Sequence, residues 1–186
     1  MSTTATTSTC SASLRSRLIG AWSLISYQAF SPSYPGDLIY PMTPHATGIV
    51  MYTPDGYVSV QLQLPGQARF SSADISGGTD EERAEAFRRY PGYTGPYYVD
   101  ERESENGSER KNETEKERRT KPVLRHEMSI ASFPNWMGSV QSRIAEISED
   151  GTELTLRTAE PVECAGAMRH GVLKWRRLPR NVPTEP

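Results

Sequence analysis

Apolar and polar residues alternate strictly over residues 57–64, and this period of two constrains the fold more than any other feature of the sequence. The apolar set is Val58, Val60, Leu62 and Leu64, and the intervening set is Tyr57, Ser59, Gln61 and Gln63. Successive side chains of a β-strand point to opposite faces, so the pattern predicts a strand with one buried face. Thr53-Pro-Asp-Gly56 is typical of a tight turn, and the apolar residues 48–52 precede it. The two segments therefore form a predicted β-hairpin.

Further segments have the length and apolar content of strands. They are residues 22–28, 93–100, 122–131, 139–147, 152–158 and 171–178. Glu149-Asp-Gly151 marks a second hairpin turn, and most of the other connections are short. Short connections join antiparallel neighbours. The sequence therefore predicts an all-β protein with eight strands in up-and-down order, which can close into a barrel without exposed edges.

One short helix is predicted at residues 79–90. Thr79 and Glu82 have the spacing of a capping box, and Pro91-Gly92 ends the helix. The apolar stripe of this helix is narrow, so the helix cannot form a core alone. We expect it to cover either one end of the barrel or a sheet edge, and the sequence favours neither.

Three polar segments lie outside the predicted strands. Residues 1–16 and 179–186 are predicted to be loose tails, and residues 101–121 contain no apolar side chain. A segment without apolar side chains has nothing to bury, so residues 101–121 are predicted to be a flexible charged loop. These segments account for much of the low hydrophobic content of 35%. The rest suffices for one barrel domain at residues 17–178.

Charge and cysteine content exclude several classes of partner. The formal net charge is −2, whereas nucleic-acid-binding proteins usually have a basic face. Cys10 and Cys164 are too few for a disulfide framework, and no clustered metal ligands or nucleotide-binding motif are present. We therefore expect no metal, no cofactor and no nucleic acid. Residues 1–20 lack the apolar core of a secretory signal, and no apolar run reaches the ~18 residues of a membrane span. A cytoplasmic protein without membrane association is expected.

The first and the last predicted strands carry tryptophan and arginine. Gly20-Ala-Trp22 opens the first strand, and Trp175-Arg-Arg177 lies in the last. This arrangement resembles the lipocalin pattern, in which a Gly-x-Trp tryptophan plugs one end and a last-strand arginine packs across its ring. A guanidinium over an indole face is a favourable cation–π contact.

The sequence is more closely similar to the lipocalin-like domain family of bacteria and fungi. The similar segments are residues 18–22, 48–57, 93–100 and 126–143, the last including Phe133-Pro-Asn-Trp136. In this order they span nearly the whole chain except its tails. The family has a short hairpin where this chain carries residues 101–121. The resemblance implies an eight-stranded antiparallel lipocalin-like barrel with one short helix.

His126 is the first candidate for a functional side chain. Alternation along residues 122–131 places Leu124, His126, Met128 and Ile130 on one face, which is the apolar and inward face. A histidine there is either a core residue with one hydrogen bond or a catalytic acid or base. Ligation of a metal or haem is less favoured, because His45 and His170 are predicted to lie in loops.

Polar groups on the neighbouring strands extend this candidate site. The resemblance places Gln141 and Arg143 on the inner face. A buried arginine needs a carboxylate, a carbonyl-rich ligand or a tyrosine hydroxyl as its partner. Alternatively, Arg143 points outward and Val140 and Ile144 point inward. Tyr93 and Tyr97 are further candidates, although core packing is the favoured role for at least one of them. Asn135 and Trp136 are candidates as well, and a structural role in the turn is equally compatible with them.

These polar groups in an apolar interior favour an enzyme, a cofactor-free isomerase or cyclase for a polyketide- or terpenoid-like natural product. In this hypothesis His126 moves a proton, and Arg143 or the hydroxyl of Tyr97 stabilises an enolate oxygen. The residues expected to contact the substrate are Tyr93, Met128, Asn135, Trp136 and Gln141. The alternative is a carrier that binds an apolar small molecule without chemistry. A third hypothesis is an interaction module that docks a partner through residues 101–121. A homodimer is compatible with the sequence.

Overall fold

The computed structural model describes residues 13–34, 36–100 and 121–181. Its helices are α1 (Leu14–Leu18), α2 (Asp80–Arg88) and the 3-10 turn η1 (Pro134–Trp136). Its strands are β1 (Gly20–Phe30), β2 (Leu38–Ile39), β3 (Thr47–Tyr52), β4 (Tyr57–Gln63), β5 (Gly92–Asp100), β6 (Val123–Glu127), β7 (Ile130–Ala131), β8 (Val140–Ile147), β9 (Glu153–Thr158), β10 (Val162–Cys164) and β11 (Ala167–Arg177).

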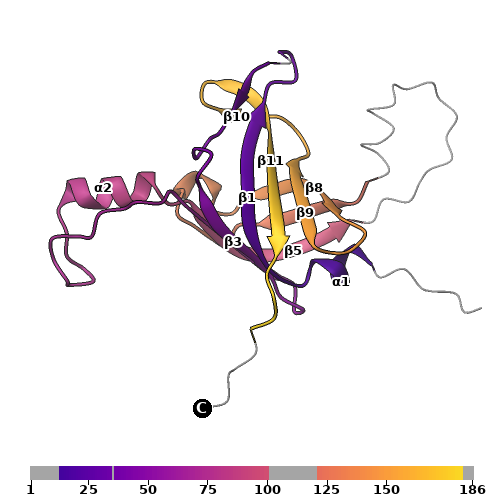
Figure 1. Cartoon of the computed structure of the whole chain (residues 1–186), viewed down its shortest axis with the longest axis horizontal. Coiled ribbons are helices and arrows are strands. Elements are labelled where there is room, and N and C mark those ends of the chain that lie inside the picture. Colours follow the sequence, from indigo (N-terminus) through magenta and orange to yellow (C-terminus); the bar gives the residue numbers. More distant parts are fainter. Residues whose placement is uncertain (1–12, 35, 101–120, 182–186) are drawn as a thin grey trace, which may run out of the picture.

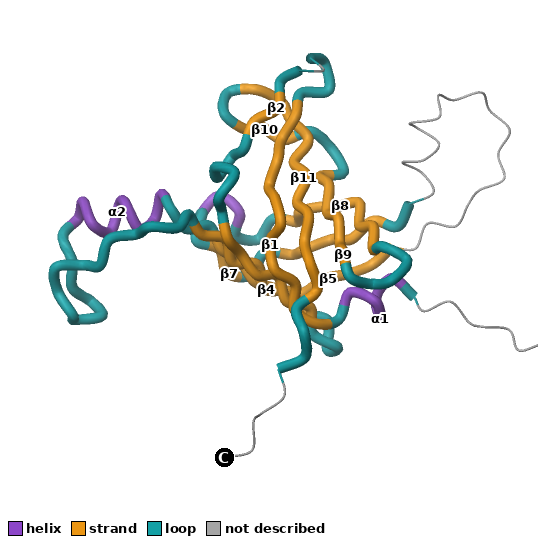
Figure 2. Tube along the Cα trace, viewed as in Figure 1, coloured by secondary structure: helices purple, strands orange, loops and turns teal. Residues whose placement is uncertain are grey.

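Eight antiparallel strands close into a barrel, which confirms the predicted fold (Figures 1 and 2). Neighbours pair in the order β1, β3, β4, β5, β6, β8, β9 and β11, and β11 pairs again with β1. The closing seam runs from the pair Trp22 and Arg177 to the pair Phe30 and His170. The strands β2, β7 and β10 are short additions to this barrel.

Trp22 plugs one end of the barrel, as the Gly-x-Trp pattern predicts. Its side chain is fully buried, and its indole Nε1 donates to the carbonyl oxygen of Leu18 at 2.9 Å. The guanidinium carbon of Arg177 lies 3.8 Å from the centroid of the Trp22 ring. Arg177 also donates to the carbonyl oxygens of Ile19 and Gly151, at 2.9 and 2.7 Å. The last-strand arginine of the predicted contact is therefore Arg177. Its guanidinium joins Trp22 to the backbone at Ile19, before β1, and at Gly151, before β9.

The N-terminal boundary of the domain differs from the prediction. The sequence assigns residues 14–16 to the tail, whereas the structure places them in α1. Ser13 caps this helix by accepting from the amide of Ser16, and Leu18 at its end is fully buried. Leu14 packs against the same core. The reason is burial, because leucines four residues apart give even a short polar segment one apolar face.

The helix α2 has the predicted capping box, but it covers neither an end of the barrel nor a sheet edge. Thr79 accepts from the amide of Glu82, and the carboxylate of Glu82 accepts from the amide of Thr79. No residue of α2 is buried, and the helix projects away from the barrel beside the chain that leads to it (Figure 1). The narrow apolar stripe that prevents this helix from forming a core also gives it too little area to cover the barrel.

The predicted strand at residues 122–131 is broken into β6 and β7. The amide of Met128 donates to the carbonyl oxygen of Ser139, and the amide of Ser129 donates to that of Thr94. This irregularity turns the chain, so Ile130 is 66% exposed rather than inward as alternation predicts. Met128 remains fully buried.

Gly95 lies beneath the end of β6, and we expect its replacement to be costly. A Cβ atom at Gly95 would collide with the carbonyl oxygen of Glu127, which is backbone and cannot move aside. Gly95→Ala should therefore lower the free energy of unfolding by about 1–3 kcal/mol. Gly36→Ala is the matched control, because a Cβ atom at Gly36 would meet nothing within 4 Å beyond its chain neighbours. Equal urea midpoints for the two variants would contradict the proposed close approach.

Several predictions concern residues that the structure leaves undescribed. Residues 1–12, 101–120 and 182–186 lie outside the described part of the chain. The flexible loop and the loose ends of both tails therefore stay predictions. Within the described residues, no helix is both long enough and apolar enough to cross a membrane.

Candidate ligand-binding site

Strand register determines which polar side chains face the barrel interior. His126 on β6 pairs with Tyr97 on β5 and with Gln141 on β8, and Leu124 pairs with Arg143. Side chains of directly opposed residues lie on the same face. Gln141 and Arg143 therefore share the inner face with the fully buried Leu124 and His126. Ile144 is also buried, although it lies on the opposite face of β8.

His126 is held between two tyrosine hydroxyls. Its Nε2 lies 3.1 Å from the hydroxyl oxygen of Tyr52, and its Nδ1 lies 2.8 Å from that of Tyr93. Burial lowers the pKa of His126 to about 3, with a further contribution from the charge of Arg143. The imidazole is therefore neutral near pH 7, with one nitrogen that donates and one that accepts.

Because the imidazole is neutral, the side chains of Tyr52, His126 and Tyr93 form one continuous chain of hydrogen bonds, which we call the relay. One tyrosine hydroxyl donates to the ring, and the other accepts from it. The accepting tyrosine keeps its own proton free to donate elsewhere. Tyr52 is 2% exposed and packs edge-on against Tyr97, whereas Tyr93 is only partly buried. Tyr93 is thus the less buried end of the relay.

Arg143 brings a positive charge next to this relay. Its guanidinium contacts Oε1 of Gln141 at 3.5 Å and the carbonyl oxygen of Ser142 at 3.3 Å. Among residues 13–34, 36–100 and 121–181, no carboxylate lies within ion-pair distance of it. Burial raises the pKa of Tyr27, Tyr52 and Tyr93, and the charge of Arg143 opposes that rise at all three. Arg143 therefore acts electrostatically on a cluster of three tyrosines and one histidine.

Tyr27 and Tyr52 belong to the cluster but are not among the residues that the sequence singles out. Strict alternation from Trp22 places Ser26 inside and Tyr27 outside. A register shift between Leu24 and Ser26 reverses this, so Tyr27 packs against the core. Tyr52 ends a predicted strand and alternates with Val50, so its inward position could have been found from the pattern.

The predicted catalytic tyrosine, Tyr97, has another set of contacts. Its side chain is 1% exposed, its hydroxyl donates to the carbonyl oxygen of Thr53 at 3.2 Å, and the guanidinium carbon of Arg15 lies 5.0 Å from its ring centroid. These contacts hold it near the turn and α1. Tyr93, which the sequence predicts to contact the substrate, is the tyrosine of β5 within hydrogen-bond distance of His126.

The predicted turn residues lie beside Tyr93. Trp136 in η1 packs edge-on against the Tyr93 ring, with a centroid distance of 5.9 Å, and against Phe133 at 5.5 Å. Asn135 is exposed. The structure thus connects Trp136 to the relay through Tyr93.

Comparison with known proteins identifies the family. The model of a lipocalin-like domain family matches residues 19–178. The chain belongs to this lipocalin-like family. It is also 34% identical over 123 residues to the 4'-hydroxy-3'-methoxypropiophenone carrier protein ppsC of Aspergillus oryzae (strain ATCC 42149 / RIB 40). That match covers 66% of this chain and 98% of ppsC.

Not every side chain that packs against the core of this lipocalin-like barrel is fully buried. Several inward side chains pack on the core but stay partly exposed, namely Leu24, Tyr27, Tyr93, Val99, Ile147 and Leu173. The side chains of Trp22, Leu154 and Trp175 themselves are fully buried. Arg143 and Gln141 are likewise partly exposed. In the described residues, no group of three or more acidic, cysteine or histidine side chains could hold a metal.

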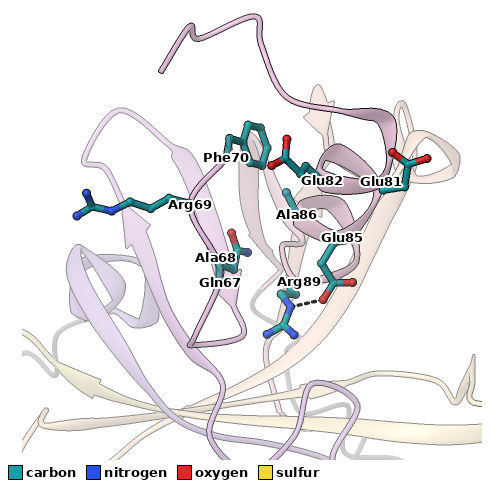
Figure 3. Close-up of a pocket in the computed structure, with 9 residues that line it drawn as sticks. All are labelled: Gln67, Ala68, Arg69, Phe70, Glu81, Glu82, Glu85, Ala86 and Arg89. Atoms are coloured by element: carbon teal, nitrogen blue, oxygen red, sulfur yellow. Dashed lines mark hydrogen bonds and ion pairs between the residues drawn. The ribbon is translucent and has the colours of Figure 1, made fainter. Parts of the chain in front are cut away.

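A surface hollow of about 270 Å³ lies outside the barrel, between α2 and residues 67–70 (Figure 3). Its polar side chains already stabilise the projecting helix. Glu82 accepts from Ser71 and Thr79, and Arg89 pairs with Glu85 and donates to the carbonyl oxygen of Pro65. This hollow is therefore explained by the packing of α2, and the interior cluster is the better candidate site.

Proposed function

We propose that this lipocalin-like protein is a carrier that binds a small, largely apolar aryl ketone in its barrel and releases it unchanged. The observation that carries the proposal is the relay of Tyr52, His126 and Tyr93 beside Arg143, set within an otherwise apolar interior. An apolar lining with a few convergent polar groups is typical of small-molecule sites. Under this proposal the polyketide- or terpenoid-like ligand expected from the sequence narrows to an aromatic one.

The likeness to ppsC supports this ligand class. Its printed ligand, 4'-hydroxy-3'-methoxypropiophenone, is an aryl ketone with one phenolic hydroxyl. Such a molecule suits the lining described above, because its ring and alkyl chain fit apolar side chains. Its oxygen atoms can pair with Tyr93, Gln141 or Arg143.

The electrostatics of His126 argue against the isomerase or cyclase hypothesis. A general acid or base works best when its pKa lies near the working pH. With a pKa of about 3, His126 is protonated in only about one molecule in ten thousand at pH 7. It is therefore a poor proton donor and a weak base, which leaves the relay better suited to binding than to proton transfer.

The direct test is titration with 4'-hydroxy-3'-methoxypropiophenone, followed by recovery of the ligand. We expect saturable binding with one ligand per chain, measured by calorimetry, and a recovered compound identical to the one added by mass and retention time. Conversion of the ligand into a product would favour the enzyme hypothesis. Absence of saturable binding would refute the proposed ligand class.

Removal of the Tyr93 hydroxyl should weaken binding without unfolding the barrel. Tyr93→Phe deletes the hydroxyl at the less buried end of the relay, so we expect affinity to fall about fivefold, the scale of one neutral hydrogen bond. Tyr98→Phe is the matched control, because Tyr98 belongs to the same strand, lies on its outer face and is 48% exposed. Equal losses in both variants would show that the hydroxyl of Tyr93 does not contact the ligand.

A further inference from the structure

The charge inside the barrel is unbalanced around Arg143. Its charge lowers the pKa of Tyr27 from β1, Tyr52 from β3, Tyr93 from β5 and His126 from β6. The tyrosines are neutral phenols because burial raises their pKa, and the histidine is a neutral imidazole. On the β10–β11 side, Cys164 acts on Tyr27, and His170 lies 3.4 Å from the hydroxyl of Thr158. The three tyrosines and His126 are neutral near pH 7, so this cluster carries the positive charge of Arg143.

We propose that the ligand binds as a phenolate, with its oxygen anion paired to Arg143 and hydrogen-bonded by tyrosine hydroxyls. This inference rests on the proposed function and specifies the chemical state of the ligand. The Arg143 side chain is partly exposed, and an opposite charge stabilises a charge that has lost part of its contact with water. Since the described residues offer Arg143 no carboxylate, an anionic ligand supplies the missing charge.

The relay can direct its protons toward such an anion. In one tautomer of His126, Tyr52 donates to Nε2, and Nδ1–H donates to the hydroxyl oxygen of Tyr93. The proton of Tyr93 then remains free to donate to the ligand oxygen. Hydrogen bonds to a charged acceptor are stronger than those between neutral groups. The same tyrosines that a neutral ligand would use thus favour an anionic one.

Ionisation of the ligand requires only the loss of its phenolic proton. The O–H bond of the ligand phenol breaks, its electron pair stays on the oxygen, and the proton passes to solvent. A phenol with a carbonyl group in the para position is more acidic than a tyrosine side chain, because the carbonyl delocalises the negative charge. The raised pKa of the buried tyrosines widens this difference, so the ligand ionises before the protein does.

The test uses the absorbance of 4'-hydroxy-3'-methoxypropiophenone, whose phenolate absorbs at longer wavelength than its phenol. Below the pKa of the free compound, the bound ligand should show the phenolate band. Calorimetry in two buffers of different ionisation enthalpy should give about one proton released per ligand. Affinity should rise about tenfold per pH unit in this range and level off above the ligand pKa. The O-methyl ether, which cannot ionise, should bind at least about tenfold more weakly.

Variants at Arg143 test whether its positive charge causes the bound ligand to ionise. Arg143→Lys keeps the charge and should keep the phenolate band, whereas Arg143→Met should lose both the band and the proton release. Arg125→Met is the control, because Arg125 lies on the outer face of β6 and pairs with Asp100. Binding by the parent protein with the spectrum of the neutral phenol and no proton release would overturn the inference while leaving the carrier function intact. Absence of binding by both the phenol and its ether would overturn both.

Discussion

Acidification from pH 7 to pH 4 is expected to remove about 3 kcal/mol of folding free energy through His126 alone. Its pKa falls from an ordinary value near 6.5 to about 3 in the folded barrel. The unfolded chain therefore binds a proton in this range that the folded chain excludes. The stabilisation is fully present above pH 6.5 and is lost as the pH falls toward 3. Urea denaturation at pH 7, 6, 5 and 4 measures this loss.

His126→Gln separates this contribution from other acid-sensitive groups. An amide can still donate to one tyrosine hydroxyl and accept from the other, but it does not titrate. The variant should therefore lose little stability between pH 6 and 5, where the parent loses roughly 1 kcal/mol. Carboxylates with a lowered pKa, such as that of Asp150, act at lower pH. His45→Gln, at an exposed loop position, should retain the slope of the parent, and a parental slope in His126→Gln would contradict the assignment.

The strands could be predicted from the sequence where one face is clearly apolar. Residues 57–64 predict β4 (Tyr57–Gln63) closely, because burial of alternate side chains is a local property of a strand. The sequence could not predict the break after β6, since it depends on the amide of Ser129 pairing with Thr94 of another strand. Nor could it predict where α2 lies, because the capping box determines the start of a helix and not what the helix packs against.

The candidate site was predictable only in part. Alternation was sufficient to place His126 inside, but its hydroxyl partners come from strands far apart in the sequence, at Tyr52 and Tyr93. Tyr27 depends on a bulge in β1, which arises from pairing with β11 at the other end of the chain. The inward position of Arg143 follows from its pairing with Leu124. These positions depend on the pairing register of strands that are far apart in the sequence. The apolar or polar nature of individual residues does not specify that register.

Removal of the plug tryptophan should have the largest effect of any single substitution that we predict. Trp22→Ala leaves a large cavity in a fully buried site and deletes the bond from its Nε1 to the Leu18 carbonyl oxygen. It also removes the ring on which the guanidinium of Arg177 lies. Substitutions of this kind cost about 3–5 kcal/mol, so the urea midpoint should fall sharply.

Two further variants make this prediction decisive. Trp22→Phe keeps an aromatic face for Arg177 and should recover more than half of the loss, which gives a folded variant if the alanine protein does not fold. Phe87→Ala, on the 52% exposed side chain of the projecting helix, should change stability by no more than about 0.5 kcal/mol. If Trp22→Ala and Phe87→Ala unfolded at the same urea concentration, the plug would contribute nothing to stability. Its contact with Arg177 would then not hold the first and last strands together.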